Sequence, residues 1–130
     1  MNISHSAIVL LSLLITSCHR EREKSAELIE ANRLHLEAMK IASELEMKLE
    51  KLTTESRPPA TKVRVDSLHK LIQLWERNVV EVPGFPHTHE HSHEAHEHRS
   101  VPPMTDESML DYQQKSWEAI KELQSEAAQL

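Results

Sequence analysis

The stretch from Leu28 to Leu52 reads LIEANRLHLEAMKIASELEMKLEKL, and one set of its positions recurs at alternating spacings of three and four residues. Seven of the eight residues at these positions are apolar, and His35 is the exception. The set is Leu28, Ala31, His35, Ala38, Ala42, Leu45, Leu49 and Leu52. Because this spacing places side chains on one side of an α-helix, it predicts an amphipathic helix over about 25–54.

A second helix is predicted on the C-terminal side of Pro58-Pro59, because two successive prolines are expected to end the first helix. It is expected over about 62–82, with Asp66 as its N-cap if it begins late. The dipeptide Pro83-Gly84 closes it. Its apolar positions keep the same spacing and are Val65, Leu68, Ile72, Trp75, Val79 and Val82.

A third helix is predicted over about 105–128, where Thr105 is a good N-cap. Gln113 and Ser116 make its apolar side less regular than those of the other two. The apolar side carries Met109, Leu110, Tyr112, Trp117, Ile120, Leu123, Ala127 and Leu130.

Three such segments predict an all-α fold, a small antiparallel three-helix bundle over 25–130. The helices over 62–82 and 105–128 would form a hairpin joined by a disordered His-rich loop, 86–103. An extended arrangement, in which the first helix pairs with another copy of the chain, is the alternative. With one glycine and four aromatic residues the composition favours helices around a thin core, and the net charge of −6 argues against a nucleic-acid partner.

The loop contains six of the ten histidines of the chain within twelve residues, from His87 to His98, a segment called the His tract below. Imidazole is a common ligand for zinc, copper and nickel, and carboxylates can complete such sites. The predicted metal ligands are His87, His89, His91, His93, His96 and His98, with Glu90, Glu94 and Glu97. Alternating histidines do not line one face of a helix, so we expect the tract to wrap an ion as a loop. A polar linker without function and a proton-sensing segment are the alternatives.

The N-terminal residues Ala7 to Ile15 form an apolar run of the length found in secretory signals, followed by Ile15-Thr16-Ser17-Cys18. This end resembles the lipobox of bacterial lipoproteins, in which a branched apolar residue and two small residues precede a cysteine. The resemblance implies removal of residues 1–17, lipidation of Cys18 and a tether over 18–24. Because His19 and not aspartate follows the cysteine, it also implies an outer-membrane location facing the periplasm. A plain secretion signal and a short buried helix are the alternatives.

The predicted function is that of a lipid-anchored envelope protein, similar to small His-rich bacterial lipoproteins, that binds or buffers a divalent transition metal. Its partners would be the membrane, through Cys18, and metal ions. The second hypothesis is a structural or adaptor lipoprotein whose helices bind a protein partner or a second copy through the first helix, with the tract as a spacer. Motifs of catalytic sites and of organic cofactors are not found, so an enzyme is not expected.

Overall fold

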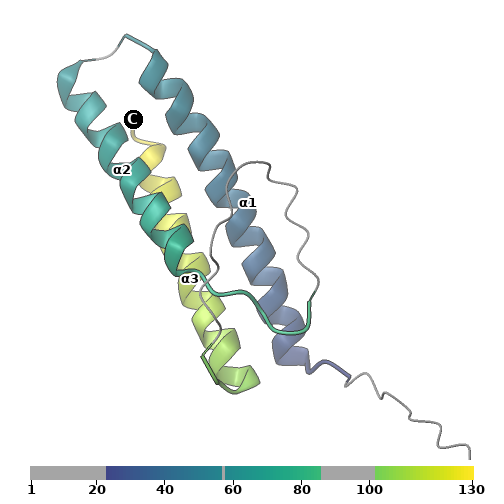
Figure 1. Cartoon of the computed structure of the whole chain (residues 1–130). Helices are drawn as coiled ribbons and strands as arrows, with labels where there is room; N and C mark the ends of the chain where they lie inside the picture. Colours follow the sequence, from purple (N-terminus) through teal and green to yellow (C-terminus); the bar gives the residue numbers. More distant parts are fainter. Residues whose placement is uncertain (1–22, 57, 86–101) are drawn as a thin grey trace, which may run out of the picture.

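The computed structural model describes residues 23–56, 58–85 and 102–130, and within them it contains three helices and no strand. These are α1 (Ala26–Thr54), α2 (Pro59–Asn78) and α3 (Asp106–Ala127). The three helices pack together with α2 antiparallel to both α1 and α3, so that α1 and α3 run in the same direction (Figure 1). The predicted all-α three-helix fold is therefore confirmed.

The start of α1 and the start of α3 are set by side-chain caps. Ser25 precedes α1, and its hydroxyl accepts a hydrogen bond from the backbone N–H of Leu28 at 3.2 Å. Thr105 acts in the same way for α3, accepting from the N–H of Ser108 at 3.2 Å, as the sequence predicts. Each cap satisfies one of the backbone donors that the first turn of a helix leaves without a partner.

The bounds of α2 differ from the prediction at both ends. The helix begins at Pro59, so Asp66 lies in its interior and is not a cap. Proline suits the first helical position, because its missing N–H would have no partner there and its fixed φ is already helical. The helix ends at Asn78, since Val79 is extended at ψ 137°, and the predicted continuation to residue 82 is wrong.

The predicted apolar side of α1 forms the centre of the core. From Ala31 onward every one of its predicted positions is buried, and Leu28 is partly buried. Leu34 and Ile41 are buried as well, so the buried side is wider than a heptad seam. The extra width follows from the packing, because α1 contacts two helices, with α3 covering it more extensively than α2 does.

The core consists of two clusters along the bundle. The larger one joins α1 to Val65, Leu68 and Ile72 of α2 and to Ile120 and Ala127 of α3. The smaller one lies near the start of α1 and consists of Ala31, Val80, Val82 and Met109, with Leu28, Phe85, Met104, Leu110 and Tyr112 packed against it. We call this smaller group the end cluster. It contains residues from both sides of the His tract.

Candidate functional site

The predicted functional residues lie outside the described part of the chain. They are Cys18, His87, His89, His91, His93, His96, His98, Glu90, Glu94 and Glu97. The structure describes the residues on either side of the tract, Phe85 and Pro102, and the start of α1, which follows the predicted tether. These flanking residues show where the described chain leads into the candidate site and out of it.

The chain leading into the tract is held against the start of α1. The ammonium of Lys24 lies over the ring of Phe85, 4.6 Å from its centroid, in a cation–π contact. Gly84 precedes that ring with φ +82°, a left-handed conformation that glycine adopts without strain. After this turn, Phe85 packs against the end cluster. Its contact residue Lys24 follows Cys18 by six residues.

The chain leaving the tract returns to the same end of the bundle. Pro102, Pro103 and Met104 border a hollow of about 290 Å³, together with Leu28 of α1 and other residues from both sides of the tract. The complete lining is Leu28, Pro83, Pro102, Pro103, Met104, Thr105, Asp106 and Met109. Both flanks of the tract therefore lie at the end of the bundle where α1 begins (Figure 1).

Polar contacts from α3 fix the segment that connects α2 to the tract. The Nε2 group of Gln113 donates a hydrogen bond to the carbonyl of Val80 at 2.5 Å, and Tyr112 Oη donates to the carbonyl of Asn78 at 2.6 Å. A further hydrogen bond joins the helices themselves, from Trp75 Nε1 of α2 to the carbonyl of Ser116 of α3 at 2.9 Å. Gln113 is fully buried, so the residue that seemed to interrupt the apolar side of this helix in fact anchors a neighbouring segment. Glutamine in an otherwise apolar face was the sequence signal for it.

Replacing Gln113 by methionine should lower the free energy of unfolding by about 1 kcal/mol, because the buried carbonyl of Val80 loses its donor while side-chain volume is nearly kept. Urea denaturation followed by circular dichroism measures this. The matched control is Gln114→Met on the exposed side of α3, which should leave stability unchanged. Equal stability of the two variants and the parent would show that this bond does not hold the connecting segment.

The two histidines and two tryptophans of the helices lie in or beside the packed core or at the surface of the bundle. His35 is buried in the seam of α1, whereas His69 is partly exposed on α2. Trp75 and Trp117 pack against the larger core cluster. Across residues 23–56, 58–85 and 102–130, no group of three or more His, Cys, Asp or Glu side chains is arranged to hold a metal ion. A metal site built from the described residues alone is therefore not seen.

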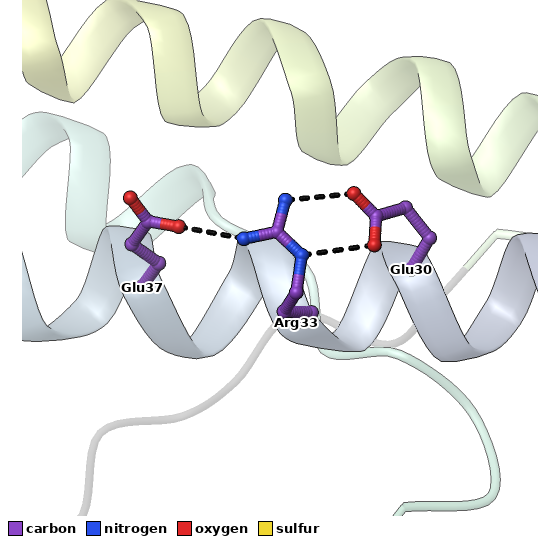
Figure 2. A network of polar contacts seen from close by, with 3 residues as sticks. All are labelled: Glu30, Arg33 and Glu37. Atoms are coloured by element: carbon purple, nitrogen blue, oxygen red, sulfur yellow. Dashed lines mark hydrogen bonds and ion pairs between the residues drawn. The ribbon is translucent and has the colours of Figure 1, made fainter.

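A network of ion pairs between Arg33, Glu30 and Glu37 lies on the exposed side of α1 and joins residues of that helix to one another. The guanidinium of Arg33 donates to both carboxylate oxygens of Glu30, at 2.9 and 2.7 Å, and to Glu37 at 2.9 Å (Figure 2). The hydrogen bonds between Arg33 and Glu30 are the main reason that the pKa of Glu30 lies below its usual value; desolvation opposes them, and the charge of Arg33 lowers the pKa by a smaller amount. A depressed pKa gives stability that is present above the unfolded-state pKa and is lost as the pH falls through the folded one. The network is exposed, so its contribution is small.

Comparisons with models of protein families, with curated proteins and with solved structures give no match. Among the helices in the described residues, none is both long and apolar enough to cross a membrane.

Proposed function

We propose that this chain is a lipid-anchored protein of the cell envelope that binds a divalent transition metal through the His tract. Cys18 would carry the lipid, and the outer membrane facing the periplasm is the expected location. The observation that carries the proposal is the density of ligands, six histidines and three glutamates between His87 and His98. Zinc, copper(II) and nickel(II) all accept such nitrogen and oxygen ligand sets.

The arrangement of the flanking residues supports this function in one respect. Phe85 and Pro102, which flank the tract, both lie at the end of the bundle where α1 begins, so the fold fixes the chain on each side of the tract at that end. A loop with fixed ends has fewer conformations to lose than a free tail with the same histidines. The fold thus lowers the entropic cost of gathering several imidazoles around one ion.

The same arrangement supports a position near the membrane. Lys24 follows Cys18 by six residues, and an extended tether of that length spans roughly 20 Å. Since Lys24 contacts Phe85, at the entrance to the tract, a lipidated Cys18 would keep the metal-binding segment close to the bilayer surface. An ion captured there would be available to other proteins of the same membrane.

Equilibrium dialysis of the full chain against zinc, copper(II) and nickel(II) tests the metal site. Replacing all six tract histidines by alanine should remove most of the bound metal, and binding by the parent should weaken in acid because the ligating imidazoles must be neutral. The matched control replaces His19 and His69, which lie outside the tract, and should bind as the parent does. Equal binding by the six-alanine variant and the parent would refute the proposal.

The adaptor hypothesis rests on the long seam of α1, and the structure shows that seam buried beneath α2 and α3. A partner of α1 would therefore have to contact its other side, where Ile29, Leu36 and Met47 are exposed. These three side chains are separated by charged residues, including Arg33 and Lys40. No further observation favours this second function.

A further inference from the structure

The helix α2 differs in charge from the rest of the molecule. It carries four basic side chains, Lys62, Arg64, Lys70 and Arg77, against the two acidic side chains of Asp66 and Glu76. In α3 the balance is reversed, with six acidic side chains against two lysines, and the whole chain has a net charge of −6. A basic helix in an acidic protein indicates a surface suited to an anionic partner.

The outward face of α2 is also apolar. Val63, Leu71 and Leu74 are 65%, 44% and 49% exposed, although each is a large hydrophobic residue. With 3.6 residues per turn, positions 63, 67, 71 and 74 follow one face of the helix. The buried residues Val65, Leu68 and Ile72 are on the opposite side, toward the core. Thus α2 has one apolar face for the bundle and a second one without a partner in the described structure.

The basic side chains flank this second face. Lys70 precedes Leu74 by four residues and Arg77 follows it by three, so both lie beside this apolar residue. Arg64 precedes Leu71 by seven residues, which places it on the same side of the helix two turns away. All three are exposed. The ion pairs of Arg33 with Glu30 and Glu37 and of Lys40 with Glu44 lie on α1, and that of Lys115 with Asp111 lies on α3. Asp66 is four residues from both Lys62 and Lys70, and with four basic side chains against two acidic ones α2 keeps a net positive charge.

We propose that α2 lies on an anionic lipid surface, with Val63, Leu71 and Leu74 toward the acyl chains and the basic side chains among the head groups. Helices with an apolar face bordered by Lys and Arg bind in this way, and the long aliphatic stems of those residues extend to the interface. The acidic side chains of α1 and α3 would be repelled by the same surface, which leaves α2 as the helix that faces it. The inference does not require metal binding.

Acetylation of lysines by a water-soluble reagent, read by mass spectrometry, tests the proposal on the full chain reconstituted in vesicles. The vesicles are phosphatidylcholine, alone or with roughly one-third phosphatidylglycerol. Lys62 and Lys70 should react about fivefold more slowly on the anionic vesicles. Lys40 and Lys115 are exposed on α1 and α3, with side-chain exposures of 76% and 71%, and should react equally on both. Each lysine is compared with itself, so differences in intrinsic reactivity cancel.

A pair of double variants separates contact by the apolar face from general attraction. Leu71→Ser with Leu74→Ser should remove the protection of Lys70, whereas Ile29→Ser with Leu36→Ser on the outward side of α1 should keep it. All four side chains are exposed, and circular dichroism checks that both variants remain folded. Equal reactivity of Lys70 on the two lipids would overturn the proposal. Protection that grows with protein density and ignores phosphatidylglycerol would show a second copy on α2, and would overturn it as well.

Discussion

Replacing Leu49 by alanine should lower the free energy of unfolding by about 2–5 kcal/mol, the range measured when a buried leucine side chain is truncated. Leu49 is fully buried in the larger core cluster, where α1 meets the other helices. A small domain has only about 5–15 kcal/mol of stability in total, so the variant should unfold at a much lower urea concentration. Urea titration followed by circular dichroism at 222 nm, a wavelength sensitive to helix, measures the change.

Met47 provides the matched control for this substitution, because it lies on the same helix two residues away and is 62% exposed. Met47→Ala should change the free energy of unfolding by less than about 0.5 kcal/mol. Equal losses of stability in the two variants would show that Leu49 is not more buried than Met47 in the folded protein.

Replacing Cys18 by serine should abolish lipidation and leave the N-terminal residues 1–17 attached. A thioether-linked lipid needs the sulfur, and the proposed lipoprotein processing implies that cleavage before residue 18 depends on the cysteine. The mass of the protein extracted from membranes of an expressing bacterium measures both changes at once. The parent should carry the added mass of the acyl groups, and its sequence should begin at residue 18.

Ser17→Ala is the control for that experiment, since alanine keeps a small residue before the cysteine and should be processed as the parent is. Two results would contradict the lipid anchor. One is a parent protein without acyl mass. The other is a Cys18→Ser variant cleaved at the position used in the parent, as expected for a plain secretion signal.

The part of the fold that could be predicted from the sequence is the part set by local pattern. The periodicity of α1 identifies both its extent and its buried side, because a long helix without glycine or proline repeats the same spatial relation many times. The caps at Ser25 and Thr105 are similarly local, since each hydroxyl bonds a backbone group three residues away. Such features need no knowledge of the other helices.

The ends of α2 show where the local pattern failed. The pair Pro58-Pro59 predicts the end of the first helix, with the second expected from about residue 62, but Pro59 is itself the first residue of α2, a position that favours proline. At the other end, Val79 and Val82 continue the apolar spacing of the helix. They lie after its last residue, Asn78, where Val79 is extended, and both are still buried. Apolar spacing reports burial, and here burial continues after the helix has ended.

The surroundings of the candidate site depend on tertiary contacts and could not be predicted. The sequence identifies the histidines and the cysteine, and those assignments remain proposals because the residues lie outside the described ranges. What the structure adds is that Lys24 contacts Phe85 and that Pro102 lies at the same end of the bundle, beside Leu28. The fully buried Gln113 was likewise visible only as an irregularity until its partner, the carbonyl of Val80, was known.

The parallel pairing of α1 with α3 has a consequence for how fast the chain can fold. The most extensive helix contact joins the first and the last helix, for example where Lys48 Nζ donates to the carbonyl of Ala127 at 2.6 Å. All of α2 and the His tract lie between them in sequence. Contact order is therefore higher than in a bundle whose main interface joins neighbouring helices, and folding rates fall as contact order rises.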